Sequence, residues 1–517
     1  MKKNIYIAAF ALAMVLPVAA QETYEVADVS TQDLNGTARY VGMGGAMEAL
    51  GADISTMSTN PAGIGVFRHS QVSGSMGMVS QASEESFASA NKTNMSFDQI
   101  GFVYSTRTSR RSFLNIGFNY HKSRNFDQLL SVADRLAGAS QSKLTYDKFS
   151  SGLIKSANDL TYSQADVLFH ETLYDNSLLN DDDTFNADAY SFDGDRYQFN
   201  RGNTGYIGEY DFNISGNLND RVYLGMTIGI HDVNYRGHTL YNEKLVSNPL
   251  DLQTAALEDQ RQIDGTGADV KFGIIVRPVE TSPFRIGLYL NSPIFYSLET
   301  SNSTGLRLNN QYYRLDGSDN PRYGVLEYEY RTPWKFGLSL GHTIGSQFAL
   351  GATYEYSDYA STDARIKGDE GYDYYYDYYY DDSYSDDEMN WHIKQTLKGV
   401  STLKLGVEYR PDPTFSVRAG YNYVSPMYQQ DAYRGVDVWS LGNYFSSETS
   451  YVNWKATHRL TLGLGVVLDN LKLDLAYQYQ AKKGQFLPFA GDDANLPFDT
   501  EVSNNRNQLL MTLAYTF

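Results

Sequence analysis

The sequence predicts an all-β protein, a fourteen-stranded antiparallel transmembrane β-barrel, and three observations support this fold class. Apolar and polar or small residues alternate with a period of two in many separate segments, as strands with two unlike faces do. Short turns and much longer connections alternate along the chain, which is typical of barrels with tight turns at one rim and loops at the other. Aromatic residues crowd the ends of these segments, where membrane barrels carry interfacial girdles and where a large soluble all-β protein has no need of them.

The candidate strands are one segment at residues 72–78, six hairpins, and a last strand that ends at Phe517. Residues 100–104 pair with 114–120, 210–214 with 222–230, 270–276 with 284–290, 334–340 with 348–356, 403–409 with 415–423, and 460–468 with 471–479. Asp469 and Asn470 form a typical two-residue hairpin turn in the last pair. An even number of strands closes a barrel and leaves both chain ends at the same rim.

Six connections are far longer than a hairpin needs, and we expect them to form long outer loops. These are residues 122–206, 235–266, 294–324, 359–397, 425–454 and 483–504. The first two contain the helix-like runs FDQLLSVADRLAGA and NPLDLQTAALEDQRQ. Loops of this length in an ordered protein are usually functional.

Residues 1–20 predict a secretory signal peptide, with two lysines, an apolar run and a small-residue exit that ends at Ala20. The apolar run is short for a membrane-spanning helix of about 20 residues. The chain has no cysteine, so neither disulfides nor thiolate metal ligands hold it together. A net charge of -19 argues against nucleic acid as a partner.

The face of the strands opposite the apolar one is rich in glycine and carries a few charges. Its charged residues include Lys404, Glu408, Arg418, Lys472 and Asp474. A glycine-rich inner face leaves space in the lumen, and wide barrels enclose channels or plugs. We therefore expect something to fill that space.

Residues 21–68 lie between the signal and the first strand and show no strand-like alternation. Apolar residues recur there at helical spacing, and glycines are frequent, which predicts a compact segment that the barrel could enclose. The run GTARYVGMGGAMEALGADISTMSTNPAGIG, the fourteen strands and the aromatic end TLAYTF together resemble the FadL-type outer-membrane transporters of long-chain fatty acids and other hydrophobic compounds. The residues that match the hatch motif of that family are Asn60, Pro61 and Ala62, preceded by Gly42 and Gly45.

The resemblance implies a hatch at residues 21–68 that blocks the lumen of a barrel formed by residues 69–517. It implies that outer loops capture a hydrophobic small molecule, which leaves sideways near a kink in the third strand, where Gly117 is the candidate residue. It also implies a monomer in the outer membrane of a Gram-negative bacterium, with both termini periplasmic. The further partners would be outer-membrane lipid, lipopolysaccharide and the barrel-assembly machinery.

No catalytic pattern stands out, because the chain lacks HExxH, GxSxG and a phosphate-binding loop that opens a helix. We therefore expect no enzyme, no catalytic residue, no cofactor and no metal site. Asp181, Asp182 and Asp183 lack the spacing of a calcium loop and predict a solvated acidic surface. Two alternative functions stay open: a surface binding protein, adhesin or haem-type receptor that uses the barrel as a platform, and an open porin, which a hatch would exclude.

The run DYYYDYYYDD lies in the connection at residues 359–397. In a helix its aspartates would stack as repelling charges four residues apart. In a strand Tyr372, Tyr374, Tyr376, Tyr378 and Tyr380 would share one face. We therefore expect a β-hairpin above the membrane, which turns at DDSYSDD, returns through Met389, Trp391 and Ile393, and packs its aromatic face on loops or offers it to a ligand.

Overall fold

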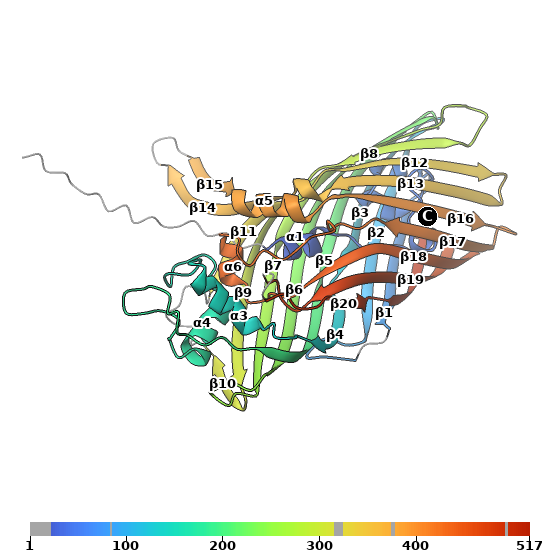
Figure 1. The fold of residues 1–517 in the computed structure, drawn as a ribbon. Helices are drawn as coiled ribbons and strands as arrows, with labels where there is room; N and C mark the ends of the chain where they lie inside the picture. Colours follow the sequence, from blue (N-terminus) through green and yellow to red (C-terminus); the bar gives the residue numbers. More distant parts are fainter. Residues whose placement is uncertain (1–21, 83–84, 315–323, 374–377, 492–494) are drawn as a thin grey trace, which may run out of the picture.

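The computed structural model describes residues 22–82, 85–314, 324–373, 378–491 and 495–517, so the predicted signal peptide lies outside the described residues. Within these ranges one antiparallel sheet closes on itself through 14 strands (Figure 1). In order around the barrel they are β1 (Gln71–Gln81), β2 (Thr93–Ser109), β3 (Ser112–Asn125), β5 (Gly194–Leu218), β6 (Val222–Leu245), β7 (Thr254–Val276), β8 (Arg285–Asn291), β12 (Lys335–Ile344), β13 (Phe348–Asp358), β16 (Gly399–Tyr409), β17 (Phe415–Val424), β18 (Tyr451–Leu468), β19 (Leu471–Leu487) and β21 (Arg506–Thr516). The pairing of Gln71 with Thr516 closes the ring, which confirms the predicted fold class.

The barrel strands expose apolar side chains on their outer face and bury polar ones on their inner face. Leu462 is 61% exposed and Ile116 is 51% exposed, whereas the inward Asn115 is fully buried. A continuous outer surface of this kind would be unfavourable in water and is stable in lipid. The barrel is therefore transmembrane.

Further strands extend the sheet beyond the barrel at the rim opposite the short turns. They are β4 (Gln128–Arg135) on β5, β9 (Phe295–Leu308) on β7, β10 (Gln311–Arg314) and β11 (Val325–Arg331) on β9, β14 (Asp363–Asp373) on β11, β15 (Tyr378–Ser385) on β14, and β20 (Thr500–Ser503) on β19. The strand that begins as β8 resumes as β9 after Pro293, and β11 resumes as β12 after Pro333. Proline has no N–H to donate, which explains why the ladders break at these two positions.

The prediction of an outer loop at residues 235–266 is wrong, because β6 and β7 continue as paired strands through most of this range. The helical interpretation of the two runs is wrong as well, because FDQLLSVADRLAGA contains β4 and NPLDLQTAALEDQRQ contains the start of β7. Ala255 and Leu257 are buried and alternate with more exposed neighbours, but the buried row continues with Asp259 and Arg261, so the apolar alternation in the sequence is too short to indicate a strand. Ladders with neighbouring strands override the local helical preference there.

Short helices fill the remaining outer connections. They are α3 (Gln141–Ser150), α4 (Gln164–Leu168), the π-helical turn η3 (Phe169–Leu173), the 3-10 turn η4 (Tyr359–Ser361), α5 (Asp387–Thr396) and α6 (Leu441–Phe445). A capping box between Ser163 and Asp166 fixes the start of α4. Among the described residues, no helix has the length and apolarity needed to cross a membrane.

The tyrosine-rich run does form part of a hairpin, but the predicted turn and return limb are wrong. Tyr372 of β14 pairs with Tyr379 of β15, and residues 381–385 of the predicted turn DDSYSDD belong to β15 rather than to a turn. The five tyrosines therefore do not share one strand, and Tyr374 and Tyr376 lie outside the described residues. Met389, Trp391 and Ile393 belong to α5, which begins at an aspartate cap.

Candidate functional site

The lumen contains residues 22–67, here called the N-terminal segment, which folds as short helices: α1 (Thr23–Ser30), α2 (Ala38–Gly42) and the 3-10 turns η1 (Ile54–Ser58) and η2 (Pro61–Val66). In Figure 1 this part of the chain lies inside the ring of barrel strands. The turn η2 contacts β5, β6 and β7, while α2 contacts β17, β18 and β19. These two groups of strands lie on opposite sides of the ring, so the N-terminal segment reaches across the lumen.

Inward glycines of the barrel make room for this segment. A Cβ atom at Gly273 would lie 2.0 Å from Asn60 Oδ1, and one at Gly225 would lie 2.4 Å from the carbonyl carbon of Pro61. A Cβ atom at Gly351, Gly406 or Gly420 would likewise lie 1.9 to 2.3 Å from a backbone atom of the segment. The glycine-rich inner face therefore does not surround empty space but lets the N-terminal segment pack against the wall.

The predicted hatch motif begins η2. Asn60 caps this turn, because its Oδ1 accepts a hydrogen bond from the Ala62 N–H at 3.2 Å and its Nδ2 donates to the Glu48 carbonyl at 3.0 Å. Pro61 follows in the first position, where its missing N–H does no harm, and its carbonyl accepts from Ser215 Oγ of β5 at 2.8 Å.

The two glycines of the motif lie at close approaches farther along the segment. A Cβ atom at Gly42 would lie 3.1 Å from the Cα of Gly463 in β18. Gly45 adopts a φ of 79°, a left-handed conformation that favours glycine. Both residues thus meet steric demands of the packed segment, and their role in a hatch stays a prediction.

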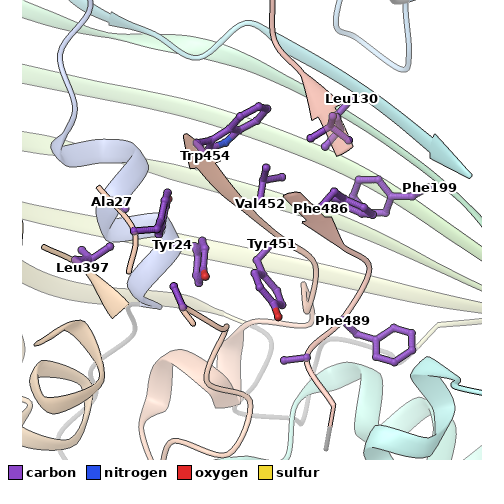
Figure 2. Close-up of a cluster of buried hydrophobic side chains, with 14 of the residues drawn as sticks. Tyr24, Ala27, Leu130, Phe199, Leu397, Tyr451, Val452, Trp454, Phe486 and Phe489 are labelled. Atoms are coloured by element: carbon purple, nitrogen blue, oxygen red, sulfur yellow. The ribbon is translucent and has the colours of Figure 1, made fainter. Parts of the chain in front are cut away.

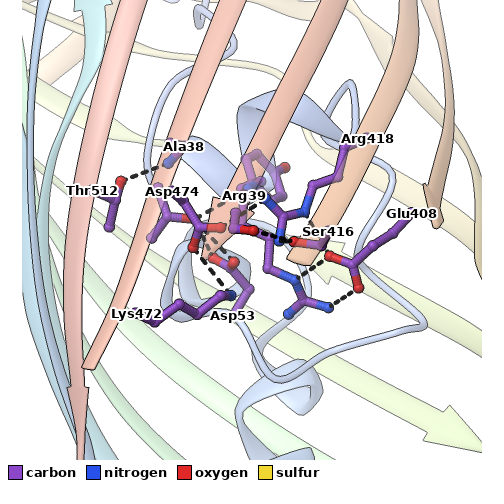
Figure 3. A network of polar contacts seen from close by, with 12 residues as sticks. Ala38, Arg39, Asp53, Glu408, Ser416, Arg418, Lys472, Asp474 and Thr512 are labelled. Carbon is purple, nitrogen blue, oxygen red and sulfur yellow. Dashed lines mark hydrogen bonds and ion pairs between the residues drawn. The ribbon is translucent and has the colours of Figure 1, made fainter. Parts of the chain in front are cut away.

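A buried network of ions joins the N-terminal segment to the barrel wall (Figure 3). Arg39 Nε of α2 lies 3.0 Å from Glu408 Oε2, which also lies 2.6 Å from Arg418 Nε. Arg418 Nη1 lies 2.7 Å from Asp474 Oδ1, and Lys472 Nζ lies 3.1 Å from Asp474 Oδ2. Removing one partner of a buried ion pair typically costs about 3–5 kcal/mol, because the other charge stays buried without compensation.

A second ion network lies on the neighbouring side of the segment. Glu48 Oε1 lies 2.9 Å from Lys404 Nζ, which lies 2.8 Å from Glu355 Oε1 of β13. The Tyr40 hydroxyl donates to Glu48 at 3.0 Å. Sequence reasoning placed Lys404, Glu408, Arg418 and Asp474 on the inner face but missed their partners Arg39 and Glu48, which are two of several charged residues in the N-terminal segment.

A cavity of about 160 Å³ lies between the N-terminal segment and the strands, and its lining is strongly charged. Asp33, Arg124 and Arg459 are among its lining residues. Burial raises the pKa of Asp33, but the guanidinium groups of Arg124, Arg506 and Arg459 outweigh it and hold the pKa below its usual range. Tyr428 and Trp454 also line the cavity, so its wall combines charged groups with aromatic surface.

An apolar cluster lies around α1 toward the outer rim (Figure 2). We call it the outer aromatic cluster and define it by Tyr24, Tyr428, Tyr451, Trp454 and Phe486. The Tyr24 ring stacks on Tyr428 at 4.9 Å and tilts against Tyr451 at 5.2 Å. The start of α1 is buried as well, and this burial raises the pKa of Glu22 to about 7 despite the nearby Arg434.

The prediction of a kink or bulge at Gly117 is wrong. Gly117 pairs in unbroken register with Val103 of β2 and Asn213 of β5, and a Cβ atom there would lie 2.2 Å from Met57 Cε. This glycine makes room for the N-terminal segment instead. The register of β3 shifts between Lys122 and Arg124, where the Asp33 N–H of the segment donates to the Ser123 carbonyl at 2.7 Å.

No family model and no curated protein sequence matches this chain. Among solved structures, a FadL homologue from Pseudomonas aeruginosa is similar, with 11% identity and a TM-score of 0.52, and the match covers 94% of this chain and 99% of that chain. The deltaS2 mutant of the monoaromatic hydrocarbon channel TodX has 11% identity and a TM-score of 0.50, with coverage of 94% and 100%. These likenesses show that the chain has the fold of FadL-type channels.

Proposed function

We propose that this chain is an outer-membrane channel for the uptake of hydrophobic small molecules of the long-chain fatty-acid type, and that its N-terminal segment is the plug. The observation that carries the proposal is a FadL-type barrel whose lumen is crossed by its own N-terminal segment beneath the outer aromatic cluster. A lumen filled in this way argues against an open porin. One similar structure is a hydrocarbon channel, and we extend that transport role, with no enzyme activity, to this chain.

The distribution of polarity favours lateral release of the ligand. The outer aromatic cluster offers apolar contact area to a molecule that has been captured by the outer connections. The buried ion networks that join the N-terminal segment to the wall would oppose passage of an apolar chain toward the short-turn rim. We therefore place the exit in the wall at the register shift of β3 near Ser123, where the N-terminal segment is hydrogen-bonded to the strand.

The proposed topology places the short-turn rim, with the start of β1 and the end of β21, in the periplasm. The apolar outer face would contact outer-membrane lipid, and the extended strands would stand among lipopolysaccharide. The barrel-assembly machinery would insert the protein as a monomer.

The test combines ligand extraction with an uptake assay in proteoliposomes. We expect mass spectrometry of detergent-purified protein to find bound acyl or other hydrophobic molecules. Trp454→Ala, which removes a buried ring from the outer aromatic cluster, should lower uptake of a fluorescent fatty acid roughly tenfold. The matched control is Trp439→Ala, because the Trp439 side chain is 58% exposed.

Three results would contradict the proposal. Steady ion conductance of the unmodified protein would indicate an open porin. Absence of both copurified ligand and uptake would favour a surface binding platform. Equal uptake by the two tryptophan variants would exclude the outer aromatic cluster from the route.

A further inference from the structure

A histidine and two carboxylates face one another inside the barrel, apart from the aromatic cluster and the ion networks described above. They are His121 of β3 and Glu209 and Asp211 of β5. Glu209 and Asp211 are two residues apart in one strand and share its inner face, and the register pairs Glu209 with His121 on the neighbouring strand. His121 is 6% exposed and both carboxylates are fully buried. The strand register thus gathers three groups that are able to bind a cation.

Lys271 of β7 neutralises only part of the charge of these carboxylates. Its Nζ lies 2.9 Å from Glu209 Oε1 and 3.1 Å from Asp211 Oδ1. The second oxygen of each carboxylate, Glu209 Oε2 or Asp211 Oδ2, has no hydrogen-bond partner within the described part of the chain. A buried carboxylate oxygen without a partner is costly, so these two oxygens favour the binding of a further cation.

The charges around the three residues do not balance either. Lys271 Nζ also lies 2.8 Å from Asp269 Oδ1, so one ammonium group faces three carboxylates. His231 of β6 contacts Asp269, with 3.2 Å between Nε2 and Oδ1. With neutral imidazoles, this group of side chains carries a formal charge of about −2 in a place that is almost fully buried. One divalent cation would neutralise this charge.

We propose that His121, Glu209 and Asp211 bind one divalent transition-metal ion through a ring nitrogen, Glu209 Oε2 and Asp211 Oδ2. One ligand atom from each of the three residues lies within 4.8 Å of the other two. His121 Nε2 lies 3.7 Å from Glu209 Oε2, and His121 Nδ1 lies 3.8 Å from Asp211 Oδ2. Ligand atoms around a tetrahedral ion with bonds of about 2.0–2.1 Å lie roughly 3.3–3.5 Å apart, so the side chains must close in by up to roughly 1.5 Å when the ion binds.

The ligand set favours zinc. One imidazole with two carboxylates is a mixed set of nitrogen and oxygen ligands, which suits first-row transition metals, whereas calcium and magnesium prefer oxygen ligands alone. Such sites generally bind zinc more tightly than manganese or iron, so Zn²⁺ is the ion for the test. His121 and Glu209 also line the cavity between the N-terminal segment and the strands, which gives the ion an approach. The bound ion would join β3 to β5 beside the register shift that follows Lys122.

The test is a Zn²⁺ titration of the untagged protein in detergent after chelator treatment, with a chromophoric chelator as competitor. We expect one tightly bound ion per chain, which excess Mg²⁺ does not displace. His121→Gln, Glu209→Gln and Asp211→Asn should each weaken Zn²⁺ binding by about 100-fold or more, because loss of a residue that only orients a metal ligand already costs about 10- to 100-fold. The matched control is His238→Gln, because His238 contacts Glu258 outside the cluster and its loss should leave the affinity unchanged.

Heat-modifiable migration in gels reports whether each variant has folded. If the three variants do not fold, zinc X-ray absorption of the unmodified protein decides, because the ion should show one imidazole and carboxylate oxygens at roughly 2.0–2.2 Å. Failure to bind a stoichiometric ion, a spectrum without imidazole, displacement by Mg²⁺, or an unchanged affinity in a folded variant of the three would overturn the proposal. Protonation of the carboxylates in place of ion binding would give the first of these results. This test does not depend on which solute the barrel transports.

Discussion

Replacing Gly273 by valine should displace the N-terminal segment from the barrel wall. The new Cβ atom would lie 2.0 Å from Asn60 Oδ1, whereas ordinary contacts begin at 3.4 Å, so the Asn60 side chain must move by more than about an ångström. That movement breaks the hydrogen bond from Asn60 Nδ2 to the Glu48 carbonyl. The backbone of β7 at Gly273 is not in the left-handed region, so the substitution should disturb the N-terminal segment rather than the strand.

The expected magnitude follows from two contributions. Overpacking of a tight site costs about 1–3 kcal/mol. Loss of the Asn60 hydrogen bond costs about 1 kcal/mol more. The sum of about 2–4 kcal/mol corresponds to a roughly 30- to 700-fold rise in the ratio of undocked to docked segment.

The assay is single-channel recording in planar bilayers. We expect the unmodified protein to conduct ions rarely and Gly273→Val to show frequent open events. Gly216→Ala is the matched control, because a Cβ atom at Gly216 would meet nothing within 4 Å. If Gly273→Val folds, as judged by heat-modifiable migration, and conducts no more than Gly216→Ala, the packing of the segment does not close the lumen.

Three further predictions concern other parts of the molecule. Glu408→Gln removes the carboxylate that the guanidinium groups of Arg39 and Arg418 share, and denaturant titrations should show a free energy of unfolding lower by about 3 kcal/mol. The control Glu280→Gln, in an exposed ion pair with Arg111, should not change the free energy of unfolding measurably. The folded-state pKa of Glu22 is raised from 4.5 to about 7, so docking of α1 should be strongest below pH 4.5 and should weaken as pH rises through 7. Amide exchange of α1, corrected for intrinsic rates, should show this pH dependence, and Glu22→Gln should abolish the pH dependence. Serine replacement of the tyrosines at residues 378–380 should leave barrel assembly unchanged, as judged by heat-modifiable migration in gels, because β15 is not one of the 14 strands that close the barrel.

The barrel was predictable because its signals are local and repeat many times. Alternating residues define each strand, and an asparagine or aspartate marks the tight turns, as at Asp469. The glycines of the inner face also pointed to a filled lumen. Their register against the N-terminal segment was not predictable, because contacts such as Gly273 with Asn60 join residues that are distant in sequence.

The errors have a common physical origin. The second helix-like run and the tyrosine run were interpreted from their own composition, whereas their structure depends on strands with which they pair, such as β6 and β14. Sequence reasoning also missed a buried row of two histidines and a glutamate on β3, β5 and β6. His121, Glu209 and His231 have no motif spacing in the sequence, and only the register of three strands places them side by side.

Because the strands differ in length, the barrel is much taller on one side than on the other. The strands β5, β6 and β7 contain 25, 24 and 23 residues, whereas β1, β17 and β21 contain 11, 10 and 11. A tilted strand needs only about 9–11 residues to cross the bilayer, so the tall side stands roughly 35 Å above the membrane. In the proposed uptake route, a molecule that approaches over the shorter strands would meet the wall formed by β5, β6 and β7, so that route would begin more nearly parallel to the membrane than perpendicular to it.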